Sequence, residues 1–309
     1  MLRALLSGVG GPARLVSGVG GPARLAGAAA CLILGAGGAV ACSFVMNFDK
    51  LSAGRPKTCS STSYVPAAGT YLYDSLDGGD TVIVGGTPLA AFAFDNPIAA
   101  TATPDPSTGC WTYNMVLSTN QTTGQVVHEH DYQFCSDAGL LVVQEVDKFS
   151  PVPGANIVAT YYCGGELYVD PCLAPGANLP LQGNCSGVAQ VVLPPAICGG
   201  PTFSLHVYLS DAEYDFRGVE TMRIGGVDAQ VLHYTQHRQT TLESQEAGVT
   251  ASDWWFVADG GLPAQHLGVT VVNQGVMTGD SGCTLATTYV STSAWRLRSL
   301  SPFPVAPDQ

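Results

Sequence analysis

Charge is the scarcest property of this 309-residue sequence. Lys and Arg together number 12 against 24 Asp and Glu, and no Lys or Arg occurs between Lys57 and Lys148. A partner with a phosphate backbone is held by Lys and Arg side chains that displace its counterions. The composition therefore predicts no nucleic-acid partner.

Three kinds of pattern are also missing. No two cysteines have the close C-x₂₋₄-C spacing that is typical of structural zinc sites. The stretches "VGGTP" and "GGVDAQ" lack the following helix that a nucleotide site requires. No stretch after residue 45 keeps a helical period. We therefore expect no cofactor, no metal site and little helix beyond the N-terminus.

The first 41 residues have the features of an export signal. Arg3, Arg14 and Arg24 occur there without any acid, and the apolar run "LAGAAACLILGAGGAVAC" follows them. The nine residues "SGVGGPARL" occur twice, at 7–15 and 17–25, and lengthen the basic region. We expect a signal peptide at 1–41 and a linker at 42–63.

Cys42 directly follows Ala39-Val40-Ala41, and this order resembles the lipobox of bacterial lipoproteins. We expect lipidation of Cys42 and attachment to the cell membrane. Simple secretion after cleavage is one alternative, and an uncleaved membrane anchor formed by 25–44 is another. All three place the rest of the chain outside the cytoplasm.

Eight cysteines follow Cys42, an even number that indicates disulfides in an exported protein. They are Cys59, Cys110, Cys135, Cys163, Cys172, Cys185, Cys198 and Cys283. Eight cysteines can pair in roughly a hundred ways, so their spacing alone does not give the connectivity.

Two segments occur twice in similar form. "HDYQFCSDAGLLVVQ" at 130–144 matches "SDWWFVADGGLPAQH" at 252–266 at five positions, and "DTVIVGG" at 80–86 matches "ETMRIGG" at 220–226. A loop insertion at 93–110 accounts for the different distance between the two matches. The sequence therefore predicts an internal duplication.

Each copy has the alternation and the turn residues of antiparallel strands. The expected fold is mainly β, with antiparallel curved sheets in a half-barrel or sandwich-like arrangement, built from the two repeats. The expected segments after the linker are β repeat 1 at 64–150, an irregular Cys/Pro-rich connector at 151–204, β repeat 2 at 205–300 and a tail at 301–309.

The aromatic residues of the repeated strand are the candidate ligand-lining residues. Period-two alternation places Tyr132 with Phe134, and Trp254 with Phe256, on one face of each copy. Trp255 is expected on the opposite face. The four aromatics either form a plain core or line an apolar cavity of roughly 300 to 1,000 Å³.

Three further patterns contain residue types that catalytic or metal sites use. "GDSG" at 279–282 is interpreted as a turn, since no histidine has the surroundings of a serine-protease base. "HEHD" at 128–131 and "HYTQH" at 233–237 could form a four-histidine metal site only if the copies pack together. Asp211, Glu213 and Asp215 are interpreted as a solvated face.

Five short motifs carry a family resemblance: "GCWTYN", "HEHDYQFC", "YYCGGELYVDPC", "GNC" and "DWWFVADGGLPAQ". Together they resemble uncharacterised exported proteins of high-GC Gram-positive bacteria, and more distantly the half-barrels of lipoprotein carriers. The resemblance implies an extracytoplasmic β-protein with disulfides Cys110–Cys135 and Cys163–Cys185. Cys59, Cys172, Cys198 and Cys283 depart from that pattern, and the helices that close a carrier half-barrel are not found.

These observations favour a non-enzymatic, envelope-associated binding or carrier module, with lipid or another apolar molecule as the candidate ligand. The alternative is a secreted hydrolase with an unrecognised carboxylate site. A nucleophile hydrogen-bonded to its base in one cleft would favour the hydrolase, whereas an apolar trough favours binding.

Overall fold

The computed structural model describes most of the chain after residue 63. The described residues are 64–136, 140–163, 168–169, 184–195, 197, 199–200, 202–243, 245–278 and 284–303. They all belong to one compact unit, Asn47–Gln309. The predicted signal peptide, Cys42, Cys59, Cys172, Cys198, Cys283 and "GDSG" lie outside the described residues.

All regular structure in these ranges is β-strand. The strands are β1 Gly69–Ser75, β2 Gly79–Val84, β3 Thr87–Ala93, β4 Ile98–Asp105, β5 Cys110–Thr119, β6 Val126–Ser136, β7 Leu140–Phe149, β8 Asn156–Cys163, β9 Tyr168–Val169, β10 Asn184–Val192, β11 Thr202–Ile224, β12 Val227–Leu242, β13 Gln245–Val257, β14 Pro263–Thr278 and β15 Thr284–Leu297. Within the described ranges, no helix has the length and apolar character needed to cross a membrane.

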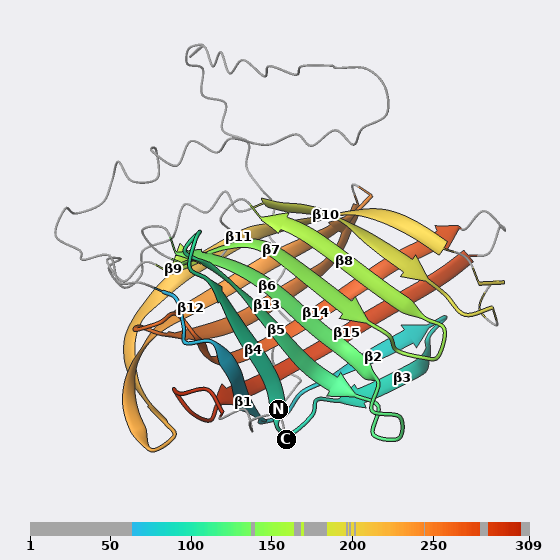
Figure 1. Cartoon of the computed structure of the whole chain (residues 1–309). Coiled ribbons are helices and arrows are strands. Elements are labelled where there is room, and N and C mark those ends of the chain that lie inside the picture. Colours follow the sequence, from blue (N-terminus) through green and yellow to red (C-terminus); the bar gives the residue numbers. More distant parts are fainter. Residues whose placement is uncertain are drawn as a thin grey trace, which may run out of the picture. The chain divides into compact units, whose positions relative to one another are not determined.

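The strands form one antiparallel sheet that closes on itself (Figure 1). The order is β1-β4-β5-β6-β7-β8-β10-β11-β12-β13-β14-β15, and β15 pairs back onto β1, with Tyr73 opposite Leu297. The result is a closed barrel of 12 strands. The β2–β3 hairpin continues the sheet from β15, and β9 pairs with β7.

The mainly β antiparallel fold is confirmed, but the half-barrel and sandwich alternatives are wrong. The pairing of β1 with β15 closes the sheet by joining the first strand to the last. Closure gives each strand of the ring a neighbour on both sides, whereas a half-barrel would have two open edges to cover; an open edge remains in the described residues at β3, outside the ring. A closed ring therefore does not require the helices that close a carrier half-barrel.

The matched hairpin turns are alike in backbone but not in their place in the sheet. Gly85 and Gly86 have φ of 56° and 80°, and Gly225 and Gly226 have 58° and 83°. Both pairs need the positive φ that favours glycine in a two-residue hairpin turn. However, β11 and β12 belong to the ring, whereas β2 and β3 lie beyond it. The structure contains one sheet rather than two related ones.

The segment 151–204 was expected to be irregular, and this is wrong in part, because it contributes β8 and β10 to the ring. Cys163 lies directly opposite Cys185 in the β8–β10 register, and the two form a disulfide. Cys110 and Cys135 are likewise opposite each other on β5 and β6 and form a disulfide. Both disulfides implied by the family resemblance are confirmed.

Aromatic side chains fill one part of the barrel interior. The largest fully buried side chains include Trp111, Tyr113, Phe134, Phe216, Tyr234 and Phe256. Tyr73 from β1 is hydrogen-bonded to Tyr113 from β5 and donates to the carbonyl oxygen of Pro263, 2.8 Å away. A smaller cluster of Val82, Val127 and Phe149 is separate from it. Along β6, the interior-facing side chains run from Phe134 in the first cluster to His128, whose ring contacts Phe149.

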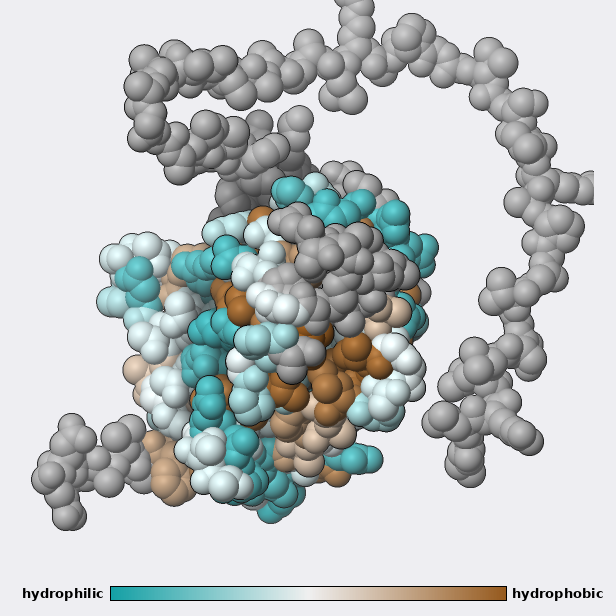
Figure 2. Space-filling model, turned by 90° about the vertical axis from the view of Figure 1, so that its right-hand side faces the viewer, coloured by the Kyte–Doolittle hydropathy of each residue, from teal (hydrophilic) through white to brown (hydrophobic). Residues whose placement is uncertain are grey.

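Apolar side chains are not confined to the interior. Figure 2 looks at the molecule from the right-hand side of Figure 1, and hydrophobic side chains are gathered in one area of that face among mainly hydrophilic ones. Exposed large hydrophobic residues include Tyr162, Val188 and Tyr208 on β8, β10 and β11.

Candidate functional site

A cavity of about 250 Å³ lies inside the barrel. Its volume is just below the lower end of the range expected from the sequence. The described residues that line it come from β2, the residue after β3, β5 to β8, and β10 to β15, so nearly the whole ring contributes.

The two sides of the cavity differ in chemistry. Apart from the charged side chains of β6 and β7, the strands β5 to β11 supply a mainly apolar wall, which includes Met115, Leu117, Phe134, Val142, Phe149, Ile157, Ala159, Ala189, Val207 and Leu209. The strands β12 to β15 supply hydroxyl and amide groups from Gln236, Thr240, Thr250, Ser252, Thr270, Thr287, Ser291 and Ser293. A cavity with these walls fits a molecule with one apolar and one polar side.

Three of the four predicted lining residues are at the cavity, and the fourth is not. Tyr132, Phe134 and Trp254 line it. Phe256 is fully buried in the aromatic part of the interior and stacks on Trp254 with ring centroids 5.7 Å apart. Strand periodicity predicts correctly that Phe256 faces the barrel interior, but it does not give the position of Phe256 along the barrel axis. The prediction that Phe256 lines the cavity is therefore wrong. Trp255 faces outward, where its ring stacks on His233 at 4.2 Å.

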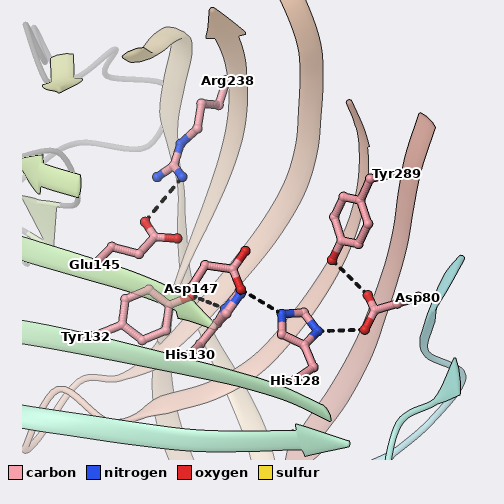
Figure 3. A network of polar contacts seen from close by, with 8 residues as sticks. All are labelled: Asp80, His128, His130, Tyr132, Glu145, Asp147, Arg238 and Tyr289. Atoms are coloured by element: carbon pink, nitrogen blue, oxygen red, sulfur yellow. Dashed lines mark hydrogen bonds and ion pairs between the residues drawn. The ribbon is translucent and has the colours of Figure 1, made fainter. Parts of the chain in front are cut away.

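One part of the cavity wall is strongly polar (Figure 3). His128 lies between two carboxylates, with Nδ1 2.6 Å from Asp80 and Nε2 3.0 Å from Asp147. Nε2 of His130 is 3.3 Å from the same oxygen of Asp147. The Tyr289 hydroxyl donates to the other oxygen of Asp80 at 2.9 Å. We refer to Asp80, His128, His130 and Asp147 as the histidine–carboxylate cluster.

The charges in this cluster stabilise one another. Burial lowers the pKa of His128, but Asp147 and Asp80 outweigh that effect and raise the pKa to about 10. Burial raises the pKa of Asp147, but His130 and His128 more than offset it and hold the pKa far below its usual range. In the absence of any other ligand, His128 is therefore a cation at neutral pH and Asp147 an anion.

A second ion pair, Arg238 with Glu145, lies in the same cavity. Arg238 on β12 is 3.4 Å from Glu145 on β7, and both side chains are largely buried. Because β7 and β12 are not neighbours in the ring, this pair joins the polar and apolar walls across the interior.

The four-histidine arrangement considered at the sequence level does not form. His128 and His130 face the cavity, whereas His233 pairs with Glu220 and Asp253 and stacks on the outward-facing Trp255. His237 is exposed. The two histidine pairs lie on opposite faces of their strands, because β12 turns its even-numbered residues inward.

The predicted carboxylate group also lies away from the cavity where it is described. Asp215 pairs with the exposed Arg217 at 3.7 Å and does not line the cavity. The side chains of Asp211 and Glu213 lie outside the described part of the structure.

One serine–histidine pair in the cavity is arranged like a catalytic nucleophile and its general base. The Ser293 hydroxyl is 2.7 Å from Nδ1 of His266. Burial, together with the charges of His130 and Arg238, lowers the pKa of His266 to about 3. An imidazole with so low a pKa is a weak general base at neutral pH.

No protein-family model and no curated protein matches this chain. The chain is similar to a solved structure of a hypothetical lipoprotein, YmcC from Escherichia coli (K12), at 10% sequence identity and a TM-score of 0.28. The similarity covers 78% of this chain and 90% of that one. A TM-score this low does not establish a shared fold. The resemblance to exported proteins of high-GC Gram-positive bacteria has no support from these comparisons.

Proposed function

We propose that this protein is a non-enzymatic, envelope-associated binding or carrier module whose barrel holds a small amphipathic molecule. The observation that carries the proposal is the cavity with an apolar wall on β5 to β11 and a hydroxyl-rich wall on β12 to β15. Apolar walls favour the burial of a hydrocarbon portion. Hydroxyl and amide groups fix the orientation of a polar portion.

The size of the cavity narrows the class of ligand. Its volume of about 250 Å³ lies below the usual range of ligand sites, which begins at about 300 Å³. A single short acyl chain or a similarly slender amphiphile fits this space better than a lipid with several chains. We therefore restrict the proposed ligand from lipids in general to single-chain amphiphiles.

The compartment follows from the covalent chemistry. The disulfides Cys110–Cys135 and Cys163–Cys185 indicate folding in an oxidising, extracytoplasmic environment. With the export signal expected at 1–41, they support a place in the cell envelope or outside the cell. Attachment through a lipid on Cys42 is part of the proposal, and its alternatives are secretion and an uncleaved anchor.

The hydrolase alternative has one observation in its favour, the hydrogen bond between Ser293 and His266. The low pKa of His266 makes it a poor base, so we propose a structural role for this pair. Turnover of short-chain nitrophenyl esters by the wild-type protein, abolished in Ser293→Ala, would instead establish a hydrolase.

Binding is tested with sodium decanoate as the probe and with variants that fill the apolar wall. Ala159 and Ala189 lie opposite each other on β8 and β10 and line the cavity. The double variant Ala159→Leu/Ala189→Leu is expected to weaken decanoate binding at least tenfold, because the added side chains occupy the space for the hydrocarbon. Tryptophan fluorescence, to which Trp254 in the wall contributes, follows the titration.

The matched control is Val188→Leu, since Val188 neighbours Ala189 but is exposed on the outside of the barrel. This variant is expected to bind decanoate like the wild type. Native mass spectrometry of the protein from its own host should show a co-purified amphiphile in a 1:1 complex. Wild-type protein that binds no decanoate, or a double variant with unchanged affinity, would overturn the proposal.

A further inference from the structure

The histidine–carboxylate cluster places two imidazole nitrogens against one carboxylate oxygen. Nε2 of His128 and Nε2 of His130 lie 3.0 and 3.3 Å from Oδ1 of Asp147. One ligand atom from each of these three residues lies within 4.8 Å of the others. Tetrahedral zinc with bonds of about 2.0 to 2.2 Å to N and O separates its ligand atoms by about 3.4 Å. The two imidazole-to-carboxylate distances are close to this value, and the remaining separation, at most 4.8 Å, has to shorten to enclose such an ion.

The second ring nitrogen of each histidine, Nδ1, has an oxygen partner of its own. Nδ1 of His128 faces Asp80 at 2.6 Å, and Nδ1 of His130 faces the Tyr132 hydroxyl at 3.1 Å. A bound metal ion displaces the proton on Nε2, while each Nδ1–H donates to its oxygen partner, so that both Nε2 lone pairs point toward the ion beside Asp147. Support of this kind, a carboxylate or hydroxyl behind the histidine, fixes the tautomer and orientation of metal-ligating rings.

From this geometry we propose that His128, His130 and Asp147 bind a divalent transition-metal ion, with Asp80 and Tyr132 orienting the two imidazoles. Two histidines and one carboxylate are a donor set that suits zinc and related first-row ions. The sequence alone predicted no metal site, because it did not reveal that Asp147 and Asp80 meet the histidines.

The charges of the cluster agree with a divalent ion. In the described part of the chain, the ion pairs of Asp80 and Asp147 involve histidines only. Two carboxylates balance the charge of a divalent ion when both imidazoles are neutral. The side chain of Asp80 is fully buried, so its charge needs a partner nearby.

An open coordination position would face the cavity. His130 and Asp147 both line it, and their side chains are 22% and 28% exposed. Three protein ligands leave room for water or for a polar group of a bound molecule. The metal site itself does not depend on the proposed amphipathic ligand, because it is tested with the metal ion alone.

The experiment uses the purified full chain with its disulfides intact. Free thiols are blocked with N-ethylmaleimide, and adventitious metal is removed by a chelator and dialysis. Titration with Co²⁺ is expected to give visible d–d absorption bands that saturate at one equivalent and that one equivalent of Zn²⁺ abolishes. Calorimetry with Zn²⁺ gives the affinity.

Three variants locate the ion. His130→Gln and Asp147→Asn each remove a ligand and should weaken Zn²⁺ binding by more than about 100-fold. Asp80→Asn removes an orienting group and should weaken it by about 10- to 100-fold. His233→Gln is the matched control, because His233 also faces two carboxylates, at 2.7 and 3.0 Å, but on the outside and without a second histidine.

Two kinds of result would overturn the proposal. One is a wild-type protein that shows no saturable Co²⁺ bands at one equivalent, which decides the matter without any variant. The other is a His130→Gln protein that binds Zn²⁺ as tightly as the wild type, or a His233→Gln protein that loses as much affinity as His130→Gln. His130 is partly exposed, so its substitution remains informative if Asp147→Asn fails to fold.

Discussion

The hydroxyl oxygen of Ser293 lies 2.7 Å from Nδ1 of His266 on the wall of the barrel cavity, and the two aromatic rings of Trp254 and Trp295 cover the imidazole. The side chain of His266 is buried, so a charged imidazole at this position would lose most of its hydration. Burial and the positive charges of His130 and Arg238 lower the pKa of His266 to about 3. The folded protein therefore keeps His266 neutral well below the pH at which a free histidine is protonated.

This depressed pKa makes stability depend on pH in a defined window. The unfolded chain binds a proton at His266 below its ordinary pKa of about 6.5, whereas the folded chain does not until about pH 3. The contribution is fully present above pH 6.5 and is lost progressively as the pH falls toward 3. Between pH 7 and pH 4.5 the loss is about 2–3 kcal/mol.

The variant His266→Asn tests this dependence, because asparagine does not titrate. Urea unfolding at pH 7 and pH 4.5, with chelator present, should show a difference smaller by about 2–3 kcal/mol than in the wild type. The cost of the smaller side chain acts at both pH values and cancels in the difference. His206→Asn, at an exposed histidine, serves as the control and should keep the wild-type difference. An unchanged difference in His266→Asn would show that its pKa is not depressed.

The ion pair between Arg238 and Glu145 predicts a strong coupling across the cavity. Removing Arg238 leaves the carboxylate of Glu145 largely buried without this cation, which costs about 3–5 kcal/mol. Arg238→Met should therefore destabilise the protein by about that amount, and Glu145→Leu/Arg238→Met should recover most of it. Denaturant unfolding of the two single variants and the double variant measures the coupling.

An exposed ion pair provides the comparison. Arg223 and Asp228 lie 3.3 Å apart on the surface, where solvent screens their interaction. Arg223→Met should change the free energy of unfolding by less than about 1 kcal/mol. Equal effects at the buried and the exposed pair would contradict the burial argument.

A close backbone approach at Gly187 predicts a steric cost. A Cβ atom at Gly187 would overlap the carbonyl oxygen of Thr160 on the neighbouring strand β8. Gly187→Ala must therefore push β8 and β10 apart and should cost about 1–3 kcal/mol. Ser186→Ala, at the adjacent exposed position, should stay within about 0.5 kcal/mol of the wild type. Thermal unfolding of both variants decides whether the strands tolerate the methyl group.

The sequence predicted the class of fold because local chemistry encodes it. Alternation along the strand places Trp254 inward and Trp255 outward, and the glycine pairs at 85–86 and 225–226, which belong to the repeated segments, form hairpin turns. Closure of the barrel depends on Tyr73 meeting Leu297, which lie near opposite ends of the described part of the chain. No periodicity reports a contact between the first strand and the last.

One part of the histidine–carboxylate cluster was predictable from the sequence, and the rest was not. Alternation places His128 and His130 on one face of β6, and a hairpin count from Ser136 opposite Leu140 would set His130 against Val146. A register shift between Gln133 and Phe134 moves the partner to Asp147. Bulges of this kind are not readable from one sequence, and Asp80 reaches the cluster from a strand outside the ring.

The two disulfides join strands that are already neighbours, so their contribution to stability should come mainly from the unfolded chain. Cys110–Cys135 and Cys163–Cys185 close loops with sequence separations of 25 and 22 residues. In the chain-entropy model a loop of this length contributes about 3 kcal/mol. Each Cys-to-Ala double variant should therefore lose about 3 kcal/mol in urea unfolding, and a variant in which all four of these cysteines are replaced by Ala should lose about twice as much. Peptide mapping without reduction provides the check on pairing, and a Cys110–Cys163 linkage would show that the strands are paired differently in solution. Variants that lose stability only when both disulfides are removed would mean that one bridge compensates for the other, and the additive expectation would be wrong.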